Sequence, residues 1–312
     1  MKKLTLLLML SIAAIGLNAQ TDWSKVDFAK KYKMKTKVSG GVAKALKGSP
    51  TFINDYYISQ ASLMKGKSQA GMMQKQGVGS VFAEASLAGV SAEALQKLIE
   101  ELHAQFVQEL KGIGLNISDG QPVIEYGNES GKADRKNAWI GKTDGKVIYD
   151  KTSVLDNAPD IKEQNIFRPT DMPIYTTWAM VPGNFYNSAA KRADVNMINI
   201  NYVIRFASFD GKKSMTRNSL TTEAGLTIQP TLGITTPKGA WGGVTFDKPI
   251  EGNNDWSKGL VETDSRDGSF WGLSSKGEYS IHADEAKYIE ELRQIVLNAQ
   301  KAIVAQIKAN MK

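Results

Sequence analysis

The stretch MININYVIRFASF, residues 197–209, decides the fold of this 312-residue chain. Apolar side chains recur at every second position, and this period is typical of a β-strand with one buried face. The side chains expected on that face are Ile198, Ile200, Tyr202, Ile204 and Phe206. Asp210-Gly211 follows directly and is a strong hairpin signal. Residues 220–235 are therefore predicted to return as the antiparallel neighbour of this strand.

Two amphipathic helices are predicted, one on each side of this hairpin in the sequence. Residues 91–111 begin at Ser91, a favourable N-cap, and carry apolar side chains three and four positions apart. Residues 284–308 carry a similar apolar stripe. The width of that stripe indicates packing on a sheet rather than on a membrane or a partner helix.

These elements predict an α+β fold. Further strands are expected at residues 51–62, 81–90, 115–118, 174–180, 241–246 and 269–281. Residues 64–79 and 251–268 are predicted loops, and residues 119–171 an irregular excursion, because they are polar and rich in glycine. We expect a mixed or antiparallel sheet with the two long helices packed on one side. Residues 51–312 are predicted to form a single domain, in which residues 172–196 are the candidate sub-boundary.

The first 19 residues are predicted to be an export signal. Lys2 and Lys3 precede an uncharged apolar run at residues 4–17, and Ala19-Gln20 is the expected cleavage point. The run is shorter than the roughly 20 residues that span a bilayer, and no later segment is as apolar. We therefore expect an exported bacterial protein, periplasmic, associated with the outer membrane or secreted, without a transmembrane helix in its mature chain.

Residues 20–50 are predicted to form a basic N-terminal arm. Residues 20–47 contain eight lysines and two aspartates, whereas the remainder of the mature chain is nearly neutral. Lys31, Lys33, Lys35 and Lys37 alternate with other residues, so an extended strand would place all four on one face. Such a face favours contact with lipid headgroups or another polyanionic envelope surface. The alternative is an edge strand that lysines protect against pairing with other chains.

Three tryptophans suggest a second kind of surface. Trp241, Trp256 and Trp271 recur every 15 residues, and tryptophan rings stack on sugars. These three residues are candidates for a glycan-binding groove on the sheet. The alternative is that they are ordinary core residues.

The chain offers little of the chemistry that catalysis requires. It has no cysteine and only two histidines, which excludes disulfides, thiol nucleophiles and thiolate metal sites. His103 is expected on the exposed side of the first helix and His282 near the start of the second. Neither has the spacing of a metal site or an accompanying G-x-S-x-G motif, so we predict no catalytic residue, metal or cofactor.

Carboxylates give one remaining route to hydrolysis. Four acidic residues lie close together in the sequence and could supply an acid/base pair of the glycosidase type. They are Asp255, Glu262, Asp264 and Asp267. The adjacent pair Glu290-Glu291 is interpreted as a solvated helix face, because neighbouring residues on a helix do not face each other.

Four short segments suggest a strand, a helix and a step into another strand. They are residues 87–90 (LAGV), 94–96 (ALQ), 106–107 (FV) and 110–114 (LKGIG). This order resembles exported bacterial α+β envelope proteins of the curli-secretion-channel and peptidoglycan-synthase-activator type. The resemblance covers residues 51–118 best and implies a non-enzymatic scaffold or assembly factor. Members commonly carry a lipid-anchored cysteine, which this chain lacks.

Taken together, the sequence predicts a non-catalytic exported envelope protein that binds an envelope protein or an anionic envelope surface. We expect no nucleic-acid partner, because the chain is exported, and an oligomer is compatible with the sequence. A glycan-binding module and a glycoside-type hydrolase are the two alternatives.

Overall fold

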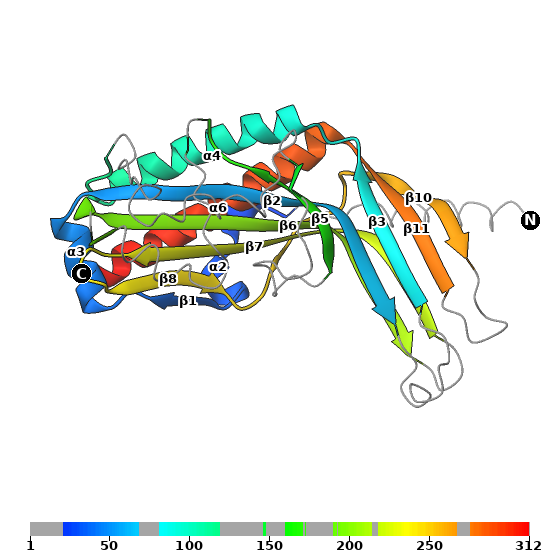
Figure 1. The fold of residues 1–312 in the computed structure, drawn as a ribbon, viewed down its shortest axis with the longest axis horizontal. Coiled ribbons are helices and arrows are strands. Elements are labelled where there is room, and N and C mark those ends of the chain that lie inside the picture. Colours follow the sequence, from blue (N-terminus) through cyan, green and yellow to red (C-terminus); the bar gives the residue numbers. More distant parts are fainter. Residues whose placement is uncertain are drawn as a thin grey trace, which may run out of the picture.

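Residues 197–209 lie in a strand in the middle of a sheet in the computed structural model. The structure describes residues 21–68, 81–118, 146–147, 160–170, 172, 190–191, 193–213, 218–266 and 275–311. The elements in chain order (Figure 1) are η1 (Trp23–Lys25), α2 (Phe28–Lys31), β1 (Met34–Lys37), α3 (Gly40–Gly48), β2 (Thr51–Ser68), β3 (Val81–Ala88), α4 (Ala92–Gly112), β4 (Lys146–Val147), β5 (Ile161–Phe167), β6 (Asn196–Lys213), β7 (Asn218–Thr235), β8 (Trp241–Phe246), β9 (Ile250–Glu251), β10 (Ser257–Arg266), β11 (Ser275–Ala283) and α6 (Glu285–Asn310).

The described strands form one mixed sheet. Their order is β1-β8-β7-β6-β2-β3-β11-β10, with β5 also beside β2, β4 beside β5 and β9 beside β7. β2 runs parallel to β6, and β3 runs parallel to β11. The other pairs are antiparallel. The predicted α+β class with a mixed sheet is therefore confirmed, and the sheet dominates the structure.

β6 supplies the centre of the hydrophobic core. All five residues predicted for its inner face, Ile198, Ile200, Tyr202, Ile204 and Phe206, are buried. β7 returns antiparallel beside it, from Asn218 opposite Lys213 to Thr235 opposite Met197. The turn predicted at Asp210-Gly211 is wrong, because both residues remain paired within the ladder, Gly211 opposite Leu220. Cross-strand pairing thus prevails over the local turn preference.

The two long helices begin where the sequence predicts. The Ser91 side chain accepts a hydrogen bond from the Ala94 amide at the start of α4. Asp284 accepts one from the Lys287 amide at the start of α6. These side chains satisfy backbone N–H groups that have no partner within the helix, so they fix where each helix starts.

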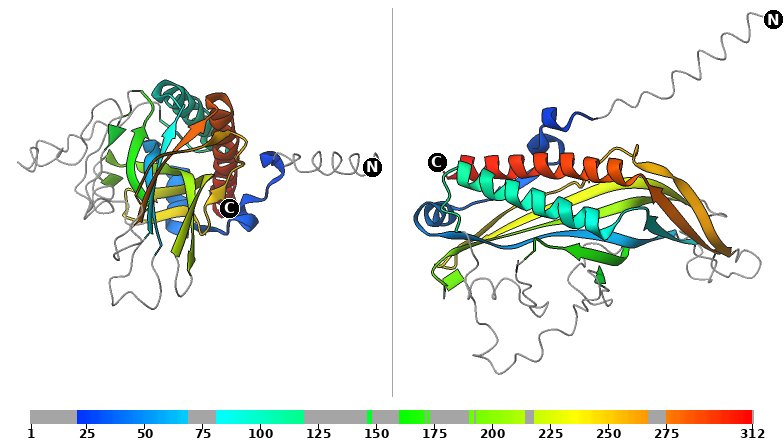
Figure 2. Two further views of the ribbon diagram at one scale, coloured as in Figure 1. Left: turned by 90° about the vertical axis from the view of Figure 1, so that its right-hand side faces the viewer. Right: turned by 90° about the horizontal axis from the view of Figure 1, so that it is seen from above.

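One face of β2 contacts both helices. Tyr56 packs against Phe106 of α4, with ring centroids 5.8 Å apart, and its hydroxyl accepts a hydrogen bond from Gln300 of α6. Gln60, which lies four residues after Tyr56 on β2, accepts a hydrogen bond of 2.9 Å from the Tyr288 hydroxyl of α6. Figure 2 shows α4 and α6 side by side along the sheet.

The N-terminal segment does not form a separate arm as predicted. Its apolar side chains are buried in the same hydrophobic cluster as those of the sheet and the long helices. They include Trp23, Phe28, Tyr32, Val42 and Leu46. β1 also pairs antiparallel with β8 and extends the sheet. Residues 21–50 are therefore an integral part of the domain, because their apolar side chains complete its core.

Several predicted loops contain strands. β2 continues to Ser68, β5 lies within the expected excursion, and β10 occupies most of the expected loop at residues 251–268. The predicted strand at residues 115–118 is reduced to one bridge between Thr51 and Ile117. The predicted strand at residues 174–180 lies outside the described residues. None of the described helices is both long enough and apolar enough to cross a membrane.

β2 and β6 separate partway along the sheet. They pair from Thr51 to Gln60, after which β3 takes over as the partner of β2 from Leu63 to Ser68. β6 continues with β7 to Lys213. The two strand pairs β2/β3 and β6/β7 therefore part beyond Gln60, and they bend away toward the lower right of Figure 1.

Candidate functional site

The four candidate lysines do not lie on one strand. Lys31 ends the short helix α2, which Asp27 caps by accepting a hydrogen bond from the Lys30 amide. Lys33 has a left-handed backbone with φ of 50°, and only Lys35 and Lys37 belong to β1. The period-two prediction is therefore wrong for Lys31 and Lys33, because a helical turn replaces the expected extended backbone. All four side chains are nevertheless exposed, and we name them the basic edge.

The surroundings of the basic edge are partly aromatic. The Nζ of Lys37 lies 5.7 Å from the centre of the Trp241 ring, and that of Lys31 lies 5.2 Å from the Tyr32 ring. Lys35 forms an ion pair of 2.8 Å with Asp247. Among the described residues, no carboxylate pairs with Lys31, Lys33 or Lys37. Three of the four lysines of the edge therefore present positive charge that no described acid neutralises.

The three candidate tryptophans do not form a common groove. Trp241 is 63% exposed on β8, whereas Trp256 is 1% exposed in the core. Trp271 lies outside the described residues. The predicted glycan groove on the sheet is therefore wrong for the Trp241–Trp256 pair, because one ring faces solvent and the other lies within the hydrophobic core.

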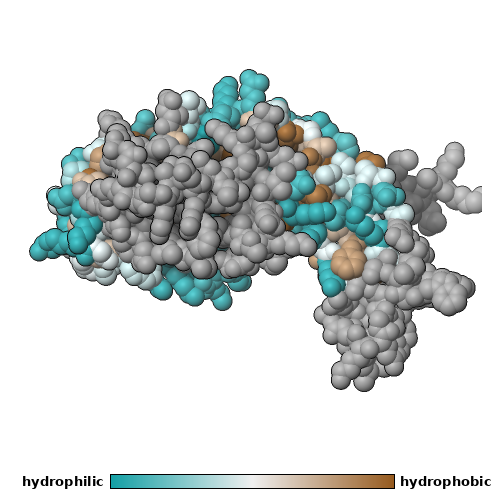
Figure 3. Space-filling model, viewed as in Figure 1, coloured by the Kyte–Doolittle hydropathy of each residue, from teal (hydrophilic) through white to brown (hydrophobic). Residues whose placement is uncertain are grey.

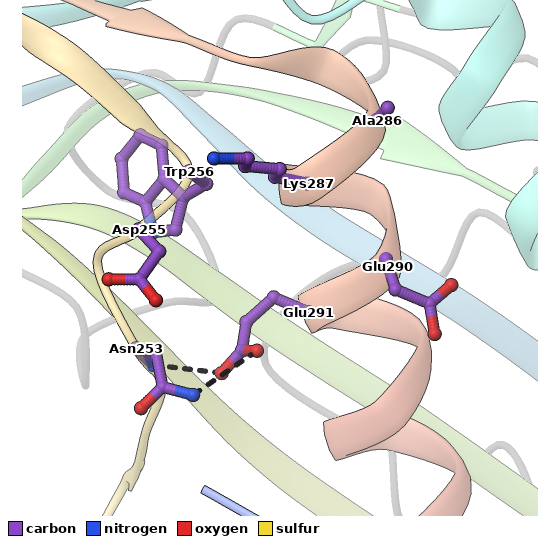
Figure 4. A pocket seen from close by; sticks show the side chains of 7 residues that line it. All are labelled: Asn253, Asp255, Trp256, Ala286, Lys287, Glu290 and Glu291. Carbon is purple, nitrogen blue, oxygen red and sulfur yellow. Dashed lines mark hydrogen bonds between the residues drawn. The ribbon is translucent and has the colours of Figure 1, made fainter. Parts of the chain in front are cut away.

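Trp256 instead lines a cavity of about 380 Å³ between α6 and the segment before β10. The other residues that line it are Asn253, Asp255, Ala286, Lys287, Glu290 and Glu291. Figure 4 shows Lys287 and Glu291 of α6 pointing toward the segment that carries Asn253 and Trp256, whereas Glu290 points away from it. The Trp256 ring packs edge-on against Tyr288 at 4.9 Å. Its Nε1 is buried and has no hydrogen-bond partner among the described residues.

Glu291 also lines this cavity. The predicted solvated helix face is wrong for this residue, because it is only 6% exposed. Its Oε1 accepts hydrogen bonds from Trp23 Nε1 at 3.1 Å and from the Asn253 amide at 2.8 Å (Figure 4 shows the latter). Glu291 therefore joins η1, α6 and the segment before β10, and its carboxylate is held by neutral donors.

The four candidate carboxylates are not gathered in one place. Asp255 lines the cavity, whereas Glu262 and Asp264 are exposed on β10 and do not line it. Asp267 lies outside the described residues. The described part of the chain also contains no cluster of three or more acidic or histidine side chains that could hold a metal ion.

The histidines are separate from these carboxylates. His103 is not fully exposed as predicted, because its ring packs edge-on against Tyr56 with centroids 5.1 Å apart. Burial lowers the pKa of His103, and Glu100 opposes that effect. His282 is exposed at the end of β11. In the described residues, neither ring has a hydrogen bond to an acid or a hydroxyl group, so no catalytic triad is formed.

Comparisons with protein-family models, with curated proteins and with solved structures give no match to this chain.

Proposed function

We propose that this chain is an exported, non-catalytic protein of the bacterial cell envelope that binds an anionic envelope surface through its basic edge. An anionic envelope protein would offer the same charge. The signal-like residues 1–19 support export. The resemblance to envelope scaffold proteins supports a role in binding rather than in catalysis. The two long helices α4 and α6 would then support the sheet that carries the binding edge.

The observation that carries this proposal is the exposed pairing of Lys37 with Trp241. The Trp241 ring is 63% exposed, so it is available for contact with a partner surface. Tryptophan favours the boundary between polar headgroups and acyl chains, and a lysine near an anionic surface contributes about 1 kcal/mol of attraction. Lys31 and Lys33 add charge just before the start of β1.

The proposal is tested by sedimentation of the mature chain with vesicles of phosphatidylglycerol or phosphatidylcholine. Replacing Lys31, Lys33, Lys35 and Lys37 with Gln should weaken binding to the anionic vesicles by at least about tenfold at low salt. High salt should weaken the unmodified protein in the same way, because it screens exposed charges.

A matched control carries the same change of net charge elsewhere. Its four substitutions to Gln are at the exposed residues Lys97, Lys258, Lys287 and Lys301. This control should retain most of the binding. If both variants bind as the unmodified protein does, the basic edge has no role in recognition, and protection of an edge strand remains its function.

A second candidate function is binding of a sugar at the Trp256 cavity. The lining of the cavity supports it, because an aromatic residue lies there beside several polar side chains. Asp255 and Lys287 supply an acceptor and a donor in the same wall.

Titration with cellobiose, chitobiose and maltose should change tryptophan fluorescence if the cavity binds sugars. The response should be weakened in Asp255→Ala and in Lys287→Ala, which keep the fluorophore but remove a polar group of the cavity wall, and persist in Trp241→Phe. A flat response to all three sugars, or one that both cavity variants retain, would contradict this function.

A further inference from the structure

The strand β10 ends the sheet with one edge that no other described strand covers. It pairs antiparallel with β11 and stands last in the strand order. Figure 1 shows it beside β11 at the right-hand end of the molecule. Figure 3 shows a largely hydrophilic described surface with apolar side chains interspersed toward that end. The backbone N–H and C=O groups along such an edge can pair with a strand of another chain.

β10 exposes apolar side chains in the middle of this edge strand. Leu260 is 40% exposed and Val261 is 51% exposed, and with Trp241 they are the large exposed apolar side chains of the described residues. The strand at the other end of the sheet order, β1, is protected differently, because it has only four residues and two of them are lysines. β10 has ten residues. Its length and its apolar centre favour pairing with another strand.

Two register shifts against β11 define the regular part of β10. They lie between Ser257 and Gly259 and between Glu262 and Asp264, so residues 259–262 pair with β11 without interruption. Irregularities of this kind interrupt a strand ladder. A partner strand is therefore expected to pair chiefly with residues 259–262, the segment that carries both exposed apolar side chains.

The exposed charges of residues 258–265 are distributed asymmetrically about this segment. Lys258 precedes it, and its Nζ makes only a long contact of 3.8 Å with Asp284. Glu262 ends the segment and Asp264 follows it, and neither forms an ion pair with a described cation. A second copy of β10 that runs antiparallel would bring opposite charges together at both ends. A parallel copy would bring like charges together.

We propose that β10 pairs antiparallel with β10 of a second copy of this chain, across a two-fold axis near Val261. In this register the Val261 side chains of the two copies lie opposite each other, and Lys258 lies opposite Asp264 on both sides of the axis. Both copies use the same edge, so the arrangement closes as a dimer rather than growing into a filament. It goes beyond the proposed function and leaves the basic edge accessible, because β1 lies at the opposite end of the strand order.

Disulfide cross-linking of the mature chain tests this pairing, because the chain has no cysteine of its own. Val261→Cys would place the Cα atoms of the two cysteines about 4.5–5.5 Å apart, a separation that permits a disulfide. This variant should form a covalent dimer under mild oxidation. Ser265→Cys is the matched control, exposed on the same strand. Its two thiols would lie on opposite sides of the axis, about 26 Å apart, so it should stay monomeric.

Exchanging the charges tests the register. In the Val261→Cys background, Lys258→Glu should slow cross-linking by about fivefold at low salt, because it places acids opposite each other at both ends. Adding Asp264→Lys should restore the rate, because the opposite charges have then changed places. Equal cross-linking of Val261→Cys and Ser265→Cys, none in either, or an absence of this loss and rescue would overturn the proposal. The basic edge is unchanged in all these variants, so its binding to vesicles can fail independently.

Discussion

At the scale of single residues, Glu109 of α4 is an unusual group. Both of its carboxylate oxygens are buried, although the residue lies on a helix surface where carboxylates are normally solvated. Burial raises the pKa of Glu109, and Gln105 and Lys301 oppose this rise without cancelling it. The folded state therefore favours the protonated form of Glu109 more than the unfolded state does.

This difference predicts a pH-dependent gain in stability for Glu109→Gln. Below the ordinary pKa of a glutamate, the carboxyl is protonated in both states and costs nothing. As the pH rises through that value toward the raised folded pKa, the folded protein loses stability. The variant should therefore be more stable than the wild type at pH 7.5, by no more than about 1 kcal/mol, and should lose this advantage at pH 4.

Urea unfolding at the two pH values measures this effect. Glu93→Gln, which changes an exposed carboxylate of the same helix, is the control. An equal stability difference between Glu109→Gln and the wild type at both pH values would show that the carboxyl is solvated in the folded state.

At the scale of elements, long periodic segments could be predicted and short or exposed ones could not. β6 and the two long helices keep one hydrophobic period over many residues, and Ser91 and Asp284 mark helix starts locally. β10 is exposed along most of its length and lies at the end of the sheet order. It has no buried face to produce an alternating pattern, and its backbone pairing with β11 defines it.

The candidate site illustrates the same limit. The sequence identifies Lys31, Lys33, Lys35 and Lys37 as an exposed basic group, but a four-residue helix that Asp27 caps changes their arrangement. The burial of Glu291 depends on Trp23, which is 268 positions away. No pattern around Glu291 could reveal that contact, because neighbouring positions of the sequence carry no information about so distant a partner.

At the scale of the whole molecule, the N-terminal segment and the last helix stabilise each other. Trp23 is 4% exposed, and its ring centroid lies 6.1 Å from that of Phe28. Its Nε1 donates to Glu291 of α6. Removing this side chain would leave a large void and an acceptor that has lost one of its donors.

We therefore expect Trp23→Ala to lower the free energy of unfolding by about 3–5 kcal/mol. Trp241→Ala is the matched control and should change it by less than about 0.5 kcal/mol, because that ring is exposed. Thermal or denaturant unfolding measures both values. Similar small effects in the two variants would mean that residues 21–50 contribute little to the core.

The bond between Trp23 and Glu291 also bears on the order in which the molecule assembles. During synthesis, the ribosome produces the partner of Trp23 only when α6 emerges, because Glu291 lies 268 positions after Trp23. β2 likewise lacks its parallel partner until β6 has been synthesised, since Thr51 pairs with Asn196. Contacts between such distant positions form slowly. A nascent chain therefore cannot complete this core until α6 has been made.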